Sequence, residues 1–254
     1  MNGQILLGLI LGATIGAVAG YLGSLMLTKR MALMGGALGH LTLPGVALAL
    51  LYGFDVSLGA IIFLAFGVAI IWFLEQKTHL HLEALTAVVF SGSLAVAFLF
   101  LPEKETDIAL LGDISEISAI MVIITVIISV ALFWTIKSIY AELILAGISP
   151  DLAQTTGANL KRNNTIYLIC IAITVALGVR IVGGLMTAAL LAIPACTAKN
   201  LCTSLKHYAL TSTLAGSLAC LMGIMIYAFF GIPAGPAIVI ASIVLFLISV
   251  LKST

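Results

Sequence analysis

One histidine, His40, lies in a long apolar part of the chain, with Gly35, Gly36 and Gly39 before it and Pro44 after it. Imidazole binds metal ions and exchanges protons near neutral pH. A histidine and irregular backbone are costly at membrane depth, so they are tolerated mainly where they line a path or contact another helix. Two roles stay open for His40: a hydrogen bond to a neighbouring helix, or a transient metal contact that helps gating. We expect no firmly bound metal, because a conduit has to release its ion.

A second set of possible ligands is His79, His81 and Glu83. At this spacing their side chains share a face only on a strand. We expect a short loop here, with solvated histidines, and His207 at a membrane interface. The four cysteines form no C-x-x-C pair and are expected to be small packing residues rather than disulfide or metal ligands; they are Cys170, Cys196, Cys202 and Cys220.

Prolines and acidic residues provide further candidates. Pro44, Pro194, Pro233 and Pro236 each free a backbone carbonyl in or beside an apolar segment. Pro194 with Thr197 predicts a kink that exposes a backbone oxygen, although an effect on helix shape alone is the alternative. Asp113 lies in an acidic stretch, residues 102–116, which either attracts cations or a docked protein or is simply solvated.

The composition requires a membrane. The chain has 254 residues, 62% hydrophobic and 8% charged, and a mean hydropathy of +1.27, whereas soluble domains are about 25% charged. A net charge of +1 argues against nucleic acid as a partner. The N-terminus lacks a basic region, and the apolar run at 5–27 is too long for a signal peptide, so it predicts a retained first span.

The apolar segments predict an all-α integral membrane protein, a polytopic helical bundle of about nine transmembrane segments forming one domain over residues 1–254. Only Arg180 and Ile181 separate the sixth span from the seventh, so one of these two is a candidate half-helix or re-entrant segment. About 20 apolar residues cross a bilayer, and we expect spans near 4–27, 32–52, 56–74, 84–101, 117–139, 164–179, 182–198, 208–230 and 234–251.

Basic residues orient these spans. If the connection at 140–163 is cytoplasmic and the spans alternate, only Lys104 and Arg180 of the eleven basic residues fall outside. Cytoplasmic loops are enriched in lysine and arginine, so we expect the N-terminus outside and the C-terminus inside. The basic residues placed inside are Lys29, Arg30, Lys77, Lys137, Lys161, Arg162, Lys199, Lys206 and Lys252.

Glycines recur every fourth residue in the first span, at Gly8, Gly12, Gly16 and Gly20. This spacing lets helices approach closely in lipid, and we expect a packing role.

The connection at 146–159 contains the signals of a short helix. Ser149 is a good N-cap, Pro150 fits the first helical position, and Asp151 suits the N-terminal dipole. Gly157 is a stop signal. A helix of about two turns is unstable alone, so the segment either docks on a partner or is a capped surface turn.

Four stretches resemble, in the same order, those of the permease subunits of bacterial ABC importers for zinc, manganese or iron. They are Arg30–Leu48, Glu83–Gly92, Leu110–Ile114, and Val179–Met186 continuing to Leu191–Ala198. The family usually has Gly-Asp-Ala-Leu-Ser-His at 35–40, so Gly36 replaces an aspartate and Gly39 a serine. Ala84 stands where an acidic residue is common. Metal identity and the transport route therefore stay open, and a divergent or impaired member remains an alternative.

The resemblance implies a fold similar to type II ABC importer permeases in the bacterial cytoplasmic membrane. It implies two permease copies in lipid, an external metal-binding protein and a cytoplasmic ATPase. The chain has no G-x-x-x-x-G-K-[ST] motif, so we expect ATP on the separate ATPase subunit, no cofactor on this chain, and no enzymatic activity of its own. The implied coupling residues are Ser149, Pro150, Asp151, Ala153 and Gly157, and the implied pathway residues are His40, Pro44, Asp113, Pro194 and Thr197.

Two other classes were weighed. An ion-coupled secondary transporter would need carboxylates in mid-span, and the sequence places none there securely. A membrane enzyme would need a cluster of histidine and acidic residues at one membrane face, and the sequence predicts no such cluster.

Overall fold

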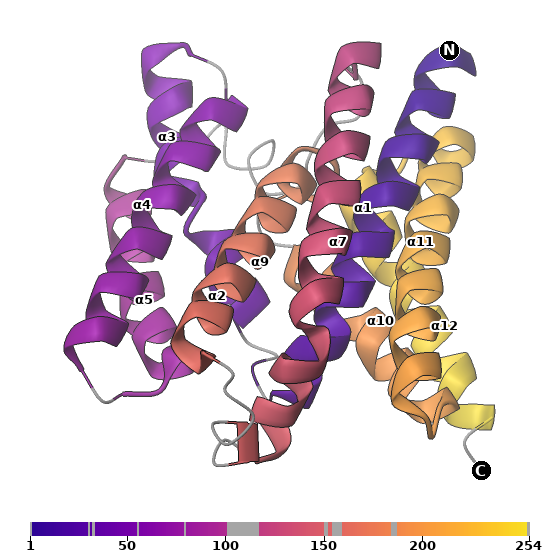
Figure 1. The fold of residues 1–254 in the computed structure, drawn as a ribbon. Coiled ribbons are helices and arrows are strands. Elements are labelled where there is room, and N and C mark those ends of the chain that lie inside the picture. Colours follow the sequence, from indigo (N-terminus) through magenta and orange to yellow (C-terminus); the bar gives the residue numbers. More distant parts are fainter. Residues whose placement is uncertain are drawn as a thin grey trace.

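The computed structural model describes residues 2–29, 31, 34–54, 56–78, 80–100, 117–149, 152–153, 159–183 and 187–252. These residues form ten α-helices and no strand, as the sequence predicts (Figure 1). The helices are α1 (Asn2–Thr28), α2 (Met34–His40), α3 (Leu43–Tyr52), α4 (Val56–Lys77), α5 (Leu82–Phe100), α7 (Ala119–Ile148), α9 (Leu160–Val182), α10 (Thr187–Leu201), α11 (Leu205–Phe230) and α12 (Ala234–Lys252).

Each of the nine predicted spans has a helical counterpart. Seven are single helices long and apolar enough to cross a membrane, namely α1, α4, α5, α7, α9, α11 and α12. The second predicted span is divided between α2 and α3, and the seventh is α10, with only 15 residues. The N-terminus and the C-terminus lie at opposite ends of the bundle, as an odd number of crossings requires (Figure 1).

The second span breaks between His40 and Leu43 for a local reason. Pro44 lies in the first turn of α3, where its missing N–H costs nothing. The Thr42 hydroxyl donates to the Gly39 carbonyl at 2.6 Å, which satisfies an acceptor at the end of α2. Two short helices therefore replace one, and His40 lies at the break.

The predicted division between the sixth and seventh spans exists, but its predicted position at Arg180 and Ile181 is wrong. Arg180 and Ile181 belong to α9, which continues to Val182. A single charged residue does not interrupt backbone hydrogen bonding, whereas Gly183 adopts a φ of +85°, which is easy only for glycine. The helix therefore ends at the glycine.

Helix α7 extends beyond the predicted end of the fifth span, residue 139. It continues to Ile148, although charged and polar residues become frequent from Lys137 onward. The polar side chains find partners: the Tyr140 hydroxyl lies 3.3 Å from Ser24 Oγ, and Glu142 accepts a hydrogen bond from Asn163. No proline stops the helix before Pro150, so polarity marks the membrane boundary but not the helix end.

Helix α1 packs against α7, α9, α10 and α11. A Cβ added to Gly16 would lie 2.4 Å from the Gly216 carbonyl oxygen, and one added to Gly20 would lie 2.1 Å from the Ser212 carbonyl oxygen. Gly12 similarly faces Ile224. The packing role predicted from the glycine spacing is therefore confirmed at three of its four positions, and at Gly16 and Gly20 the facing backbone leaves no room for a larger residue.

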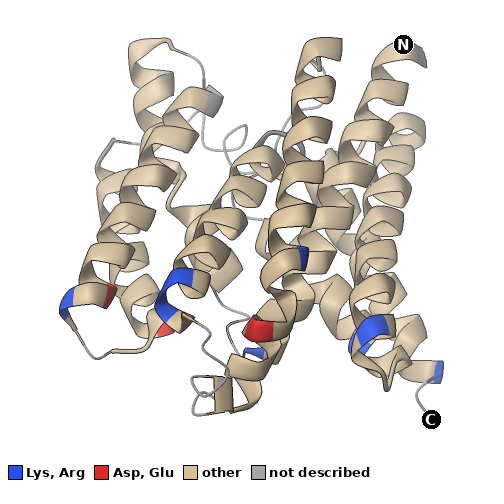
Figure 2. Ribbon diagram, viewed as in Figure 1, with Lys and Arg blue, Asp and Glu red and all other residues tan. Residues whose placement is uncertain are grey.

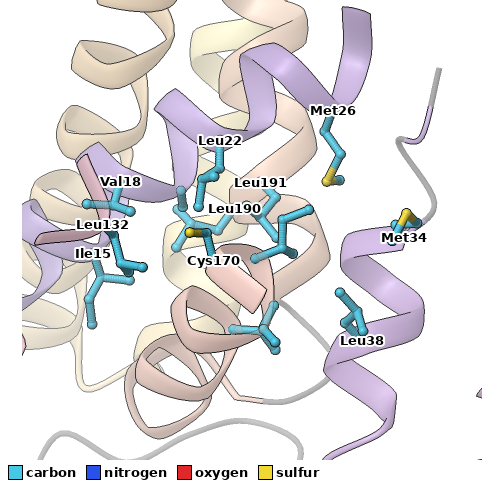
Figure 3. Packing of buried hydrophobic residues seen from close by; sticks show 14 of the residues in the cluster. Ile15, Val18, Leu22, Met26, Met34, Leu38, Leu132, Cys170, Leu190 and Leu191 are labelled. Carbon is cyan, nitrogen blue, oxygen red and sulfur yellow. The ribbon is translucent and has the colours of Figure 1, made fainter. Parts of the chain in front are cut away.

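The apolar core lies where α1, α2, α7, α9 and α10 meet. Figure 3 shows Leu22 and Met26 of α1 beside Leu190 and Leu191 of α10. Met34, from α2, lies on the other side of Met26 (Figure 3). This packing fixes α2, which carries His40, against the rest of the bundle.

Candidate functional site

His40 lines a cavity of about 320 Å³ between α2 and α5. Its ring packs on that of Phe90, with 5.1 Å between the ring centroids, and the Ser93 hydroxyl donates to the His40 carbonyl at 3.5 Å. The imidazole is half-buried, and its Nδ1 is buried without a hydrogen-bond partner. The lining residues are Met34, Gly36, Ala37, His40, Glu83, Thr86, Ala87 and Phe90.

Gly36 and His40 line this same cavity, which agrees with the helical face expected from their spacing. The opposite wall is provided by α5, where Glu83 lies in the first turn. Sequence reasoning grouped Glu83 with His79 and His81 instead. His79 lies outside the described residues, and His81 is exposed just before α5. Helical spacing was the missed signal, since residues 83, 87 and 90 recur on one face.

Among the described residues, no group of three or more His, Cys, Asp or Glu side chains is arranged to hold a metal ion. All four cysteines are free thiols, and Cys170 and Cys220 are buried, as expected of packing residues. What the His40 cavity offers is one imidazole and one carboxylate. Such a pair suits a brief contact with a cation rather than a permanent metal centre.

The other predicted pathway residues lie elsewhere. Pro44 lines a separate, largely apolar cavity of about 380 Å³ between α3, α4 and α5. Pro194 and Thr197 are buried within the packing of α10, where the Thr197 hydroxyl donates to the Ile193 carbonyl at 2.9 Å. Neither lines the His40 cavity. Asp113 lies outside the described residues.

Ser149 joins two elements at the other predicted site. Its backbone N–H donates to Leu145, which ends α7, and its Oγ accepts a hydrogen bond from the Leu152 N–H at 3.4 Å. The Ala153 N–H donates to the Ser149 carbonyl at 3.1 Å. The predicted N-cap is therefore confirmed. Ala153 is fully buried. Pro150, Asp151 and Gly157 lie outside the described residues.

Polar contacts hold both sides of this connection, and sequence reasoning missed them. Lys29, just after α1, donates to the Asn164 side chain of α9, which also hydrogen-bonds Glu75 of α4. Asn163 of α9 donates to Glu142 of α7. We call these five residues, Lys29, Glu75, Glu142, Asn163 and Asn164, the polar network. Its sequence signal was an Asn-Asn pair in the first turns of α9, directly before the apolar part of that helix.

The polar network alters the chemistry of Lys29. Burial lowers the pKa of its ammonium to about 8, and the Glu75 carboxylate opposes this shift. The ammonium also lies 5.5 Å from the centre of the Tyr167 ring, and the Tyr167 hydroxyl donates to the Leu22 carbonyl at 3.0 Å. Helices α1, α4, α7 and α9 are thus tied together next to Ser149.

Figure 2 shows that, among the residues that the structure describes, most charged ones gather at one end of the bundle, the end that holds the C-terminus. The polar network and both ends of the 149–159 connection lie at this end as well, since they adjoin the last turns of α1, α4 and α7. The charge distribution therefore distinguishes one face of the bundle from the other, as the count of basic residues predicts.

The sequence and the fold were compared with known proteins. A family model described as the ABC 3 transport family matches residues 2–253. The chain is 29% identical over 245 residues to the manganese import system permease protein ScaB of Streptococcus gordonii, which covers 95% of this chain and 88% of that protein. It is 29% identical over 253 residues to the high-affinity zinc uptake system membrane protein ZnuB of Buchnera aphidicola subsp. Baizongia pistaciae, with 96% of each chain covered.

The fold is similar to a solved structure, that of PsaBC from Streptococcus pneumoniae in complex with Fab. The TM-score is 0.80 at 28% identity, covering 95% of this chain and 89% of that one. The family match extends over nearly every residue, from residue 2 to residue 253. The chain therefore belongs to the ABC 3 transport family.

Proposed function

We propose that this protein is the membrane-spanning permease subunit of an ATP-driven importer of divalent metal ions, manganese or zinc. The observation that carries the proposal is similarity over the whole chain, 95–96% of its residues, to proteins named for manganese import and zinc uptake. A polytopic bundle with a histidine at a broken helix and a capped connection at one end suits that role.

The proposed partners follow from this role. A cytoplasmic ATPase would bind ATP and dock on the segment that begins at Ser149. Its closure would move α7 and α9, which the polar network joins to α1 and α4. An external metal-binding protein would deliver the ion to the opposite face. The acidic stretch at 102–116, which connects α5 to α7 in the sequence, is the proposed place of this contact. Two permease copies would form the path, with the N-terminus outside and the C-terminus in the cytoplasm of a bacterial inner membrane.

The chain itself is proposed to do no covalent chemistry. Its part is to offer His40 to the passing ion and to change the access to that residue. Pro44, Asp113, Pro194 and Thr197 remain candidates for the path, and Pro150, Asp151, Ala153 and Gly157 remain candidates for the contact with the ATPase. An ion-coupled secondary transporter is the alternative, and it would need no ATPase.

Metal uptake into vesicles tests the proposal. Vesicles would contain this chain, its ATPase and its binding protein, with a second set carrying an ATPase that binds but does not hydrolyse ATP. We expect manganese or zinc to accumulate only in the first set. Equal accumulation in both sets would contradict the proposal and favour the secondary transporter.

A further inference from the structure

We propose that Glu83 and His40 together form a two-ligand station for the transported divalent cation in the cavity between α2 and α5. Glu83 contributes the carboxylate, His40 contributes the imidazole, and water completes the coordination. This inference rests on the proposed function. It adds Glu83, which lies on α5, to the ion path that so far contains His40 of α2.

The first observation is placement. Glu83 and His40 come from different helices, 43 positions apart in the sequence, yet both line the same cavity of about 320 Å³. Glu83 is half-buried in the first turn of α5, and His40 is the last residue of α2. A carboxylate and an imidazole are ligands that both zinc and manganese accept.

The second observation is an unused polar atom. Nδ1 of His40 is buried and has no hydrogen-bond partner. Burying an imidazole nitrogen without a partner costs free energy, and such groups in native proteins usually have a functional reason. By contrast, the Thr86 hydroxyl beside it is already used, because it donates to the Leu82 carbonyl at 2.7 Å.

The surroundings limit how tightly an ion is held. Apart from Glu83, His40 and Thr86, the cavity is lined by Met34, Gly36, Ala37, Ala87 and Phe90. Because water takes about 30 Å³ per molecule, the cavity has room for about ten waters. An ion there keeps part of its hydration shell and makes only two bonds to charged or imidazole groups. That arrangement permits fast release, which a conduit needs.

Removal of the carboxylate provides the direct test. We expect Glu83→Gln to lower the initial rate of manganese or zinc uptake about ten-fold or more at limiting metal, in line with losses seen when metal-site residues are removed. His40→Gln should lower the uptake rate by a similar factor. The double variant should have about the same uptake rate as either single variant, because both residues act on one ion. Glu83→Asp should keep part of the activity.

A carboxylate placed at Gly36 tests whether the carboxylate of Glu83 or only its structural role matters. If Glu83 were only structural, a carboxylate at position 36 would not restore uptake. Gly36 lines the same cavity from α2, and a Cβ there would meet only the Cβ of Ala188, at 3.3 Å. A carboxylate introduced by Gly36→Asp therefore fits with a small adjustment. We expect Gly36→Asp to restore uptake to Glu83→Gln at least several-fold. Each variant would be checked for assembly with the ATPase and for basal ATP hydrolysis.

The outcomes separate the two proposals. Normal uptake by Glu83→Gln would overturn the station and leave the importer standing. A loss that neither Glu83→Asp nor Gly36→Asp reverses would also overturn it, because the defect would then not be the missing carboxylate. If wild-type vesicles show no ATP-dependent uptake of either metal, the importer itself is wrong and the station with it.

Discussion

The surroundings of Lys29 change the pH at which its ammonium loses a proton. Its pKa is about 8 instead of 10.5, so between these values the unfolded chain binds more protons than the folded one. Stability should therefore rise with pH from about 8 to about 10.5, and the penalty for burying the charge should be complete below about pH 8. The groups facing the ammonium are Glu75, Asn164 and the Tyr167 ring, and the Glu75 carboxylate also interacts with Lys161.

We expect the apparent melting temperature of the detergent-solubilised protein to increase between pH 7.5 and 9.5 relative to that of Lys29→Met, which has no such proton to lose. Lys77→Met is the matched control, since Lys77 is exposed and its removal should leave the pH dependence of the wild type. If the melting temperatures of the wild type and of Lys29→Met changed with pH in the same way, the lowered pKa of Lys29 would be wrong.

Single residues also show the limit of sequence reasoning. His40 stood out because an imidazole in an apolar run is unusual, and Ser149 because its neighbours match a capping pattern. Glu83 was grouped with the wrong partners, and Glu75 and Asn164 did not stand out, because the residues that they meet lie on other helices. A local pattern indicates which residue types are costly in lipid, but only the packing of helices shows which of them meet.

At the scale of helices, α1 and α11 pack with backbone close to backbone. Gly16→Ala would bring a Cβ to 2.4 Å from the Gly216 carbonyl oxygen, so the two helices would have to separate. We expect a loss of about 1–3 kcal/mol in stability, as for other overpacked sites, seen as a lower melting temperature and a lower yield of folded protein.

Gly92→Ala on α5 makes the same chemical change in open space, because nothing lies within 4 Å of the added Cβ. It should be neutral or slightly stabilising, since alanine favours a helix over glycine by about 1 kcal/mol. Equal melting temperatures for the two variants would show that the glycine contact does not contribute to the packing.

Helix identity was predictable here, and helix ends less so. Apolar runs located the spans, because hydrocarbon offers no hydrogen bonds and the backbone within it must form helices of mainly apolar residues. The ends of α7 and α9 were missed because Tyr140, Glu142 and Arg180 were interpreted as leaving the membrane, when helices end where capping and glycine geometry end them. The Thr42–Pro44 break was visible only as a proline, not as two separate helices.

For the whole molecule, the described helices expose many large apolar side chains to their surroundings. Helix α7 alone exposes a continuous stripe of large side chains that recurs every three or four residues, namely Ile120, Ile123, Ile127, Val130 and Trp134. A stripe of this kind in water would be an aggregation site, whereas in a bilayer it faces hydrocarbon. Burial in lipid rather than in the protein thus explains why the 62% hydrophobic composition is compatible with one small core.

The two termini lie at opposite ends (Figure 1), which allows a direct test of orientation. Gly3→Cys and Lys252→Cys would each be placed in a chain whose four native cysteines are replaced by alanine or serine. In right-side-out vesicles, we expect a membrane-impermeant thiol reagent to label the first and not the second. Labelling of only the second would invert the proposed orientation, and equal labelling of both would contradict an odd number of crossings.

Ser149 is both the C-cap of α7 and the acceptor of hydrogen bonds from the Leu152 and Ala153 N–H groups, so the described turn is attached directly to the end of α7. Helix α7 has 30 residues, about 45 Å at 1.5 Å per residue, whereas the hydrocarbon layer is about 30 Å thick. The surplus makes α7 long enough to project beyond the bilayer as a lever arm, with Ser149 and the proposed contact with the ATPase at its end. A displacement imposed at Ser149 would therefore tilt or slide the helix along its whole length.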